Sequence, residues 1–561
     1  MRVKNAFRQP SFEGSAGRIT LRLVLGHAKP PLLALVAGMA AGVALVVALT
    51  PFVTVDGPIH VGYAATLRDL LQGRGDLAGT YLDWASWTAP NTLPELGLTL
   101  LMLVFSPGIA ETVLIVLYVL ALPLAMLYAV RAWSDKADGL ALAALPLTFS
   151  YPLLLGFYSF SYSVVMFLVV AGYAGRVLPR LSWPRAGVLG ALLVVTYLTH
   201  FIGFAAAALL VVVMVVMHAR RTLLLRAGVA LAPAAILAIQ FLHSTSSAEA
   251  AKRDDAPPEV LAGTLSLVWG LVSFERSEIV ATCLLALTLA IAIVTVARTR
   301  TRRLTPSDAP MLFALLVVAG AVAAPSEVAS GGGVLTQRLA LFPVYGVVLW
   351  LAAQRPSRAV VTAVGVASIV AAVGLAALRL PAHRALAADV RDIEQVVPCI
   401  GLAATMAQVN LAQVVAGSAD RARFLTHETG RVSAATRGLD LGSPSWEVPF
   451  YLLRFDPRFA AAGSLIPARA TMLAVPPRID PARYERATRG RLDYVLLFGR
   501  PLATPAVLQS QRWRTFEGEL MRRYRRVAVS PRGLMEVWEH PGVAARGASR
   551  RAAAPGGACV G

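Results

Sequence analysis

Residues 32–60 read LLALVAGMAAGVALVVALTPFVTVDGPIH, an uncharged apolar run that ends in an acid, a Gly-Pro pair and a histidine. The run from 32 to 53 is long enough to cross a bilayer as a helix. Gly57-Pro58 is a favourable start for a second helix, and Asp56 and His60 flank it. Because ionisable groups at the mouth of a membrane span are costly, their presence indicates a functional site.

The rest of the chain continues this apolar character as far as residue 380. Of its 561 residues, 57% are hydrophobic and 15% are charged. Apolar stretches recur at the length of a membrane helix. We therefore predict a polytopic α-helical membrane protein with about eleven transmembrane helices, which lie at 32–53, 109–130, 139–156, 159–175, 186–199, 201–217, 227–243, 279–297, 310–324, 339–353 and 359–379.

The loops between these segments alternate in charge. Basic residues gather in the leader 1–31 and in the loops 131–138, 176–185, 218–226, 298–303 and 354–358. The loops 54–108 and 244–278 are acidic. Since basic loops remain cytoplasmic, we predict a cytoplasmic N-terminus and acidic loops on the outer side. An odd number of spans places the C-terminal part outside as well.

One apolar stretch, 96–105, is too short to span the hydrocarbon core at about 1.5 Å of rise per residue. A crossing there would also move every later loop to the opposite side and break the charge pattern. We predict that this stretch is interfacial or re-entrant. The transmembrane domain therefore runs from 32 to 380 and carries one long outer loop, 54–108.

The C-terminal part has ordinary polarity and predicts a second domain. Segments 471–475, 493–499, 525–530 and 534–540 have the composition of strands, while 482–488 and 504–524 have that of helices. We predict an extracytoplasmic α/β domain over 381–543, with an accessory binding or structural role, followed by a disordered tail over 544–561. Cys399 and Cys559 could form a disulfide if this domain is extracytoplasmic.

The net charge of +20 raises the question of nucleic-acid binding. Much of the excess lies in the short loops, where it sets topology, and the remainder could face anionic lipid headgroups. We see no nucleic-acid recognition module and no metal-ligand spacing of cysteine or histidine. The expected partner is therefore the lipid bilayer, and no nucleic acid is expected.

The residues after Asp56 predict an amphipathic helix on the membrane surface, because Ile59, Tyr63 and Leu67 recur at helical spacing. A carboxylate beside apolar surface can have a raised pKa and act as a general base. Alternatively, Asp56 caps the helix or is a simple interfacial acid. His60, four residues on, would orient Asp56 or contact a phosphate, or would be an ordinary interfacial residue.

This arrangement resembles the GT-C superfamily of membrane glycosyltransferases, which includes protein O-mannosyltransferases and the aminoarabinose transferase of lipid A. Those proteins have a first span, an outer loop that begins with an acid, a bundle of spans and often a C-terminal domain outside. The resemblance implies a bacterial inner (plasma) membrane enzyme, with Asp56 as catalytic base. It would transfer sugar from a polyprenyl-phosphate donor to an extracytoplasmic glycan, lipid or protein.

The sequence also departs from the family pattern. The family often has two adjacent acids where this chain has Asp56-Gly57. No Asp-x-Asp motif follows, so we expect no cofactor, although a divalent metal stays open. Two alternative functions also stay open, namely a catalytically silent GT-C-like scaffold and a transporter or flippase of lipid-linked sugars.

Four further residues on the predicted outer side are candidates for binding the donor sugar or its phosphate. His200 ends a span, and the alternative for it is a buried interhelical histidine. Gln337 and Arg338 follow a Gly-rich loop; arginine suits bidentate phosphate binding, although an interfacial arginine can also snorkel. Asp83 precedes Trp84 at a predicted headgroup depth.

Overall fold

The structure is a computed structural model, and it describes residues 30–218, 221–245, 255–300, 303–325, 334–412, 414–415, 422–459, 480–543 and 559. The predicted leader, apart from its last two residues, lies outside this part of the chain. The predicted strand 471–475, the Gly-rich segment 326–333 and the predicted tail, apart from Cys559, also lie outside it.

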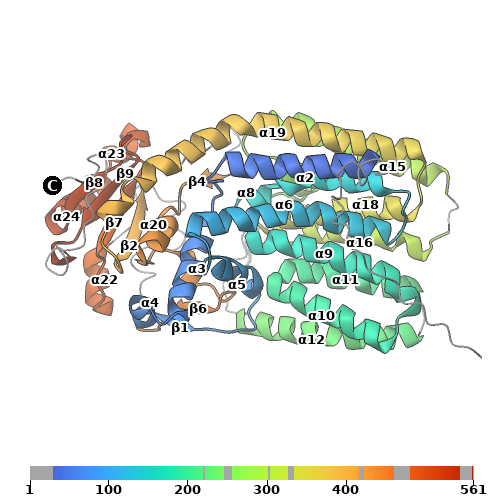
Figure 1. The fold of residues 1–561 in the computed structure, drawn as a ribbon, viewed down its shortest axis with the longest axis horizontal. Coiled ribbons are helices and arrows are strands. Elements are labelled where there is room, and N and C mark those ends of the chain that lie inside the picture. The colour runs from blue at the N-terminus through green and yellow to red at the C-terminus, as the bar shows by residue number, and fades with distance from the viewer. Residues whose placement is uncertain are drawn as a thin grey trace, which may run out of the picture.

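Within the described residues, nine helical segments are long and apolar enough to cross a membrane, and Figure 1 shows them side by side in one bundle. They are α2 (Pro30–Ala48), α6 (Pro107–Arg131), α9 (Tyr158–Val177) with η2 (Leu178–Arg180), α11 (Phe201–His218), α12 (Arg221–Thr245), α15 (Glu278–Arg298), α16 (Ala309–Ala323) with η3 (Pro306–Asp308), α17 (Leu335–Leu339) with α18 (Phe342–Ala353), and α19 (Arg358–Glu394). The chain is a multi-pass membrane protein.

Two predicted spans are shorter apolar stretches in the structure. One is α10 (Trp183–Thr199). The other is broken into η1 (Asp138–Ala143), α7 (Ala144–Thr148) and α8 (Tyr151–Leu154). Pro152 at the start of α8 cannot donate a backbone hydrogen bond, which favours a break before it. With the nine long segments, these stretches account for the predicted spans.

The outer loop folds into short helices beside the bundle. It contains α3 (Gly57–Leu71), α4 (Asp76–Tyr81), the short strand β1 (Leu82–Trp84) and α5 (Thr92–Leu101). Helix α5 covers most of the apolar stretch 96–105 and has 10 residues, too few to span. Two more short helices, α13 (Pro257–Leu265) and α14 (Val268–Leu271), lie between α12 and α15 on the chain.

Helix α3 begins at the predicted Gly57-Pro58, but the prediction that it rests on the membrane surface is wrong. All of its residues except Arg68, Leu70 and Leu71 are buried. Helices α5 and α6 cover one part of α3, and α20 (Thr429–Thr436) covers another. The apolar spacing did predict a helix. It could not show that a second layer, α20 from the distant C-terminal region, covers this helix.

The C-terminal region has a five-stranded mixed sheet with strand order β5-β2-β7-β9-β8. Strand β2 (Thr405–Asn410) runs parallel to β5 (Leu439–Asp440) and to β7 (Tyr494–Phe498), and β9 (Met535–Glu539) runs antiparallel to β7 and to β8 (Arg525–Val529). Strands β7, β8 and β9 confirm three predicted strands. The smaller elements are η4 (Val397–Cys399), β3 (Val414–Val415), β4 (Arg423–Phe424), η5 (Pro444–Trp446), β6 (Leu453–Phe455), α22 (Pro481–Thr488), η7 (Arg500–Leu502), α23 (Pro505–Leu508) and α24 (Gln511–Arg523).

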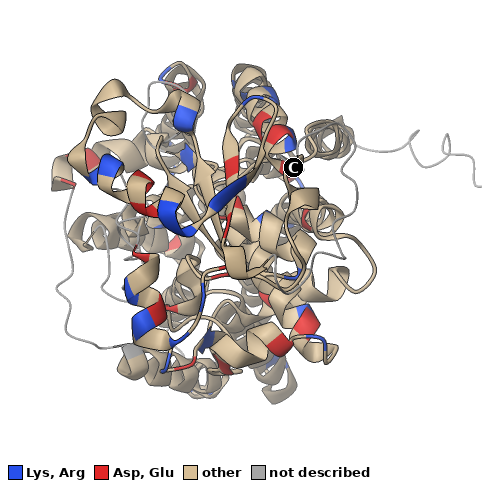
Figure 2. Ribbon diagram, turned by 90° about the vertical axis from the view of Figure 1, so that its left-hand side faces the viewer, with Lys and Arg blue, Asp and Glu red and all other residues tan. Residues whose placement is uncertain are grey.

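Two connections tie this region to the membrane domain, and a disulfide joins two parts of the region itself. Helix α19 continues without a break through Pro381 to Glu394 and slopes toward the sheet (Figure 1). Strand β6 pairs antiparallel with β1 of the outer loop. A disulfide joins Cys399, at the end of η4, to Cys559. Figure 2 views this end, where acidic and basic residues are spread over the helices and strands.

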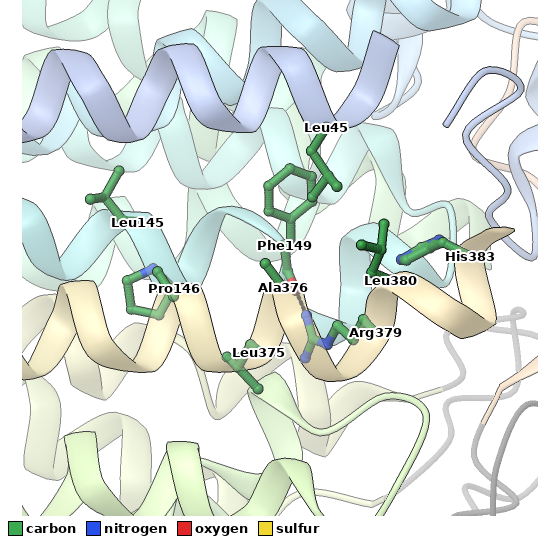
Figure 3. A pocket seen from close by; sticks show the side chains of 10 residues that line it. Leu45, Leu145, Pro146, Phe149, Leu375, Ala376, Arg379, Leu380 and His383 are labelled. Carbon is green, nitrogen blue, oxygen red and sulfur yellow. Dashed lines mark hydrogen bonds between the residues drawn. The ribbon is translucent and has the colours of Figure 1, made fainter. Parts of the chain in front are cut away.

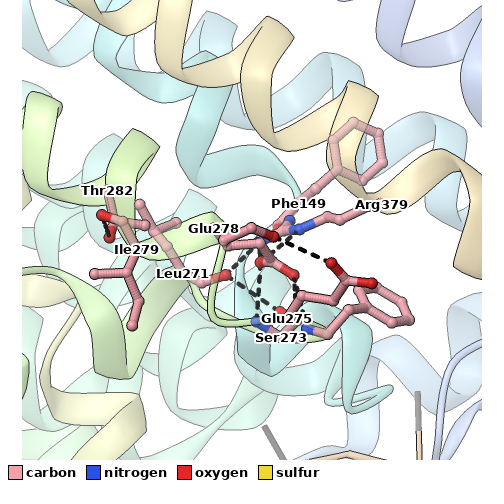
Figure 4. A network of polar contacts seen from close by, with 10 residues as sticks. Phe149, Leu271, Ser273, Glu275, Glu278, Ile279, Thr282 and Arg379 are labelled. Atoms are coloured by element: carbon pink, nitrogen blue, oxygen red, sulfur yellow. Dashed lines mark hydrogen bonds and ion pairs between the residues drawn. The ribbon is translucent and has the colours of Figure 1, made fainter. Parts of the chain in front are cut away.

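A buried ion pair locks α19 to α15. Two nitrogens of Arg379, Nε and an Nη, donate to Glu278 at 3.0 and 2.7 Å, and the guanidinium also donates to backbone carbonyls of Phe149 and Leu271. Glu278 in turn accepts from the backbone N–H groups of residues 273–275 (Figure 4). Because the oxygens of Glu278 and all three nitrogens of Arg379 are bonded, the pair acts as a fixed structural contact.

Beside this ion pair, a small, mostly apolar pocket lies between α2, α7 and α19, with Arg379 and His383 at one end (Figure 3). The His383 ring stacks on Phe52, with 4.8 Å between ring centroids. These contacts show how tightly the extramembrane end of α19 is held against the bundle.

Candidate functional site

Asp56 stands at the junction of the first span and α3, and the turn between α8 and α9 fixes its backbone. Its N–H donates to the carbonyl of Leu155 at 2.9 Å. Gly156 follows with a φ of +83°, and a Cβ there would lie 2.5 Å from the nitrogen of Gly57. Only glycine allows both this backbone conformation and so close an approach.

The Asp56 carboxylate makes no capping hydrogen bond to α3, although the residue occupies the N-cap position. This geometry argues against the helix-capping alternative. Its side chain is 21% exposed, and Oδ1 lies 3.8 Å from Nε2 of His427. Burial raises the pKa of Asp56, while the charges of His427, His60 and Arg338 act in the opposite direction without cancelling it. A carboxylate in this setting is suited to accept a proton.

His60 lies one turn along α3 and is fixed by a second acid. Its Nδ1 is hydrogen-bonded to Oε1 of Glu95, which lies on α5, and both side chains are buried. The ring packs at 5.2 Å from the ring of Tyr158 and 6.3 Å from that of Tyr451. Burial acts to lower the pKa of His60, but Glu95 and the nearby charge of Asp56 outweigh it and hold it above its ordinary value.

Arg338 on α17 brings a cation to the same place. Its guanidinium lies 4.0 Å from the centre of the Phe157 ring, and its buried Nε has no hydrogen-bond partner among the described residues. It is close enough to Asp56 and to Tyr451 for their charges to interact. A half-buried guanidinium with an open, buried Nε donor beside a carboxylate is well suited to hold a phosphate.

His200 lies between α10 and α11, within electrostatic reach of Arg338. Its Nδ1 accepts a hydrogen bond from the backbone N–H of Ile202 at 3.1 Å. In the neutral ring, Nε2 therefore carries the proton and can donate it to a ligand. The structure thus brings together Asp56, His60, His200 and Arg338.

The structure explains why Gly57, where the GT-C proteins described above often have a second acid, carries no side chain. A Cβ on Gly57 would lie 2.2 Å from Oγ1 of Thr54, 2.5 Å from Oε1 of Glu111 and 2.6 Å from the hydroxyl of Tyr158. No side chain fits there. The space is already occupied by the carboxylate of Glu111 from α6, which accepts a hydrogen bond from Tyr158 at 2.7 Å. An acid is therefore present beside Gly57 in space, although not in sequence.

Sequence reasoning missed the residues that the C-terminal region contributes. Arg431 on α20 forms a buried two-pronged ion pair with Glu111, 320 residues away in the sequence. Glu428 lies 3.4 Å from Arg431, and burial raises the pKa of its carboxyl to about 7. His427 and Tyr451 face Asp56. In the sequence, the signal that could have pointed to them is the close spacing of a histidine, an acid and a cation, His427, Glu428 and Arg431.

Of the predicted binding residues, Asp83 lies apart from this cluster, and the side chain of Gln337 contacts its own neighbour Thr336. Asp83 is exposed on β1, opposite Arg454 of β6. Gln337 precedes Arg338 on α17, and its side-chain oxygen accepts a hydrogen bond from Thr336 at 2.8 Å. Adjacent helical residues do not face the same side. In the described part of the chain, no group of three or more His, Cys, Asp or Glu is arranged to hold a metal.

The apolar bundle, the helices that follow Asp56 and the C-terminal sheet together make up a fold that a solved membrane-protein structure shares. In particular, the chain is similar to the crystal structure of ArnT from Cupriavidus metallidurans bound to undecaprenyl phosphate. The TM-score is 0.51 at 12% sequence identity, over 90% of this chain and 97% of that one. At this identity the likeness concerns the fold. No protein-family model and no curated protein matches the sequence.

Proposed function

We propose that this protein transfers a sugar from a polyprenyl-phosphate donor to a hydroxyl on an extracytoplasmic glycan, lipid or protein. The observation that carries the proposal is the pairing of an uncapped, partly exposed Asp56 carboxylate with the open guanidinium of Arg338. The ArnT structure of similar fold was obtained with undecaprenyl phosphate, and we extend that lipid class to this chain.

In the proposed reaction, Asp56 takes the proton of the acceptor hydroxyl as its oxygen attacks the anomeric carbon of the sugar. The bond between that carbon and the phosphate oxygen breaks, and the electron pair leaves with the polyprenyl phosphate. A single displacement inverts the anomeric configuration. Arg338 binds the phosphate before and after this step. The negative charge of the phosphate increases as the bond to the sugar breaks, so this contact becomes stronger.

The surrounding residues supply orientation and further donors. His60, held by Glu95 with a raised pKa, adds a positive charge behind Asp56 and favours its ionised form. His200 offers Nε2–H to the phosphate or to a sugar hydroxyl. In this proposal Asp83 and Gln337 have no part in the chemical step.

The proposed reaction takes place on the extracytoplasmic side. Two independent features support this side. Basic loops mark the opposite ends of the membrane helices as cytoplasmic, and a disulfide between Cys399 and Cys559 suits an oxidising compartment. The proposed location is the inner membrane of a bacterium, with the C-terminal region outside.

A transfer assay tests the proposal. Purified protein in lipid vesicles is given a panel of radiolabelled polyprenyl-phosphate sugars and a membrane extract as the source of acceptors. We expect transfer by the unaltered protein and by Asp83→Asn, an acid in the same outer loop but outside the cluster, and none above background by Asp56→Asn. Equal transfer by a folded Asp56→Asn variant, or no transfer from any donor, would reject the proposal.

A further inference from the structure

His427 is a buried polar group beside Asp56 for which the reaction above has no use. It lies two residues before α20, its side chain is 6% exposed, and its Nε2 is 3.8 Å from Oδ1 of Asp56. That nitrogen has no hydrogen-bond partner among the described residues. Leaving a buried polar nitrogen unpaired costs stability, so its presence beside a reactive carboxylate indicates a role.

The position of His427 is set by the close crossing of two helices. A Cβ on Gly430 would lie 1.9 Å from the carbonyl oxygen of Pro58, and a Cβ on Gly62 would lie 3.0 Å from Cα of Gly430. Glycine at both positions lets α20 and α3 approach at backbone distance. The Glu111–Arg431 ion pair also holds α20 to α6.

The two histidines that face Asp56 differ in what they are free to do. His60 is bound to Glu95 through Nδ1, and this carboxylate outweighs the effect of burial and raises the pKa of His60. His427 faces the Asp56 charge, and burial lowers its pKa, so it is neutral before the reaction. His427, whose unpaired Nε2 faces Asp56, is therefore the better placed of the two to take up a proton from it.

The other charged groups around Asp56 and His427 are cations or are already paired. Arg338 faces Asp56 as a cation, and Tyr451 faces it as a neutral phenol because burial raises its pKa. Beside His427 in the sequence, Glu428 is engaged with Arg431, which is paired with Glu111. A positive charge that forms on His427 would therefore be stabilised chiefly by the Asp56 carboxylate.

We propose that His427 is a positioning residue that relieves Asp56 of the proton it removes from the acceptor. This inference rests on the proposed function. After the acceptor oxygen has bonded to the sugar, the O–H bond of protonated Asp56 breaks and the proton moves to the lone pair of Nε2. Asp56 is left as a carboxylate beside an imidazolium, ready for the next acceptor, and the imidazolium later releases the proton to solvent.

Chemical rescue distinguishes this role from simple packing. His427→Ala should lower the rate of transfer at saturating substrates by roughly 100-fold, with little change in the KM for the donor, and imidazole added to the assay should restore much of that rate. His427→Gln preserves hydrogen bonding but accepts no proton, so it should remain slow. His540→Ala, a histidine of the same C-terminal region packed on Tyr524, should keep its rate and show no response to imidazole.

Each outcome bears on one claim. If the unaltered protein transfers no sugar, the proposed function itself fails. If the unaltered protein is active and Asp56→Asn transfers no sugar, the proposed function stands. In that case a His427→Gln or His427→Ala variant that matches the unaltered rate overturns only the role of His427. A slow His427→Ala variant that imidazole does not restore also overturns it, because lost packing would then explain the defect.

Discussion

Gly430→Ala should move α20 of the C-terminal region away from α3 and Asp56 without changing any charged residue. The added Cβ would lie 1.9 Å from the carbonyl oxygen of Pro58, whereas ordinary contacts begin at 3.4 Å. Both atoms belong to or adjoin a helix backbone, so neither can move as a side chain would. Helix α20 must therefore withdraw from α3 by roughly 1.5 Å.

This shift acts directly on the pair that we regard as central to proton transfer. His427 precedes α20 by two residues, so its Nε2 should move from 3.8 Å to more than 5 Å from Asp56. Displacements of about 1 Å at a reacting centre can cost on the order of 100-fold in rate. We therefore expect a loss of roughly 10- to 100-fold in the transfer assay.

Two alanine variants serve as controls for this experiment. Gly518→Ala introduces a Cβ with nothing within 4 Å on α24 of the same region, and it should keep the full rate. Gly62→Ala makes a milder contact, 3.0 Å from Gly430, and should fall between the two. If folded Gly430→Ala transfers sugar as fast as Gly518→Ala, the C-terminal region does not complete the site and our reasoning is refuted.

Asp56 must be ionised to act as a base, and burial raises its pKa above 3.8, the ordinary value for aspartate, so transfer should be lost as the pH falls through this raised pKa. The charge of Arg338 lowers the pKa of Asp56, so Arg338→Gln should move the acidic limb of the pH–rate profile to higher pH. Gly156→Ala should yield little folded protein by size-exclusion chromatography, since a Cβ would lie 2.5 Å from a backbone nitrogen, whereas Gly73→Ala, with φ of +64° and open space around it, should cost only about 1 kcal/mol. Arg379→Met should lower the free energy of unfolding by about 3–5 kcal/mol by leaving a buried carboxylate unpaired; an unchanged unfolding midpoint would contradict the structural role of this ion pair.

Much of the membrane architecture was predictable from local properties. Apolar runs of bilayer length mark the spans, and Gly57-Pro58 marks the start of α3, because each feature depends only on neighbouring residues. The stretch 96–105 was predicted not to cross the membrane, and α5, which covers most of it, has only 10 residues. Strands β7 to β9 were predictable for the same reason, since their β-branched, aromatic and other apolar residues form short continuous segments.

The candidate site was only partly predictable. Asp56 and His60 stand out because they interrupt apolar sequence at a membrane boundary, and Arg338 because it follows a Gly-rich segment. Asp83 met similar local criteria, yet β1 pairs it with β6 and keeps it exposed. Nothing in its neighbouring residues reveals that pairing, because the partner strand lies in the C-terminal region.

The contribution of α20 was beyond prediction for a related reason. The Glu111–Arg431 pair and the Gly62–Gly430 crossing join residues that are hundreds of positions apart. Single-sequence patterns carry no information on such contacts. They also could not show that Gly57, which looks like a missing second acid, faces the carboxylate of Glu111 and has no room for a side chain.

The most direct test of the central claim, that Asp56 is the base for sugar transfer, is a single-turnover measurement with saturating polyprenyl-phosphate sugar. The account predicts that Asp56→Asn lowers the rate of sugar transfer by about 100- to 10,000-fold, while its affinity for the donor stays within a few-fold of normal, because Arg338 is intact. A rate for Asp56→Asn equal to that of Asp83→Asn, with the donor bound normally, would contradict it.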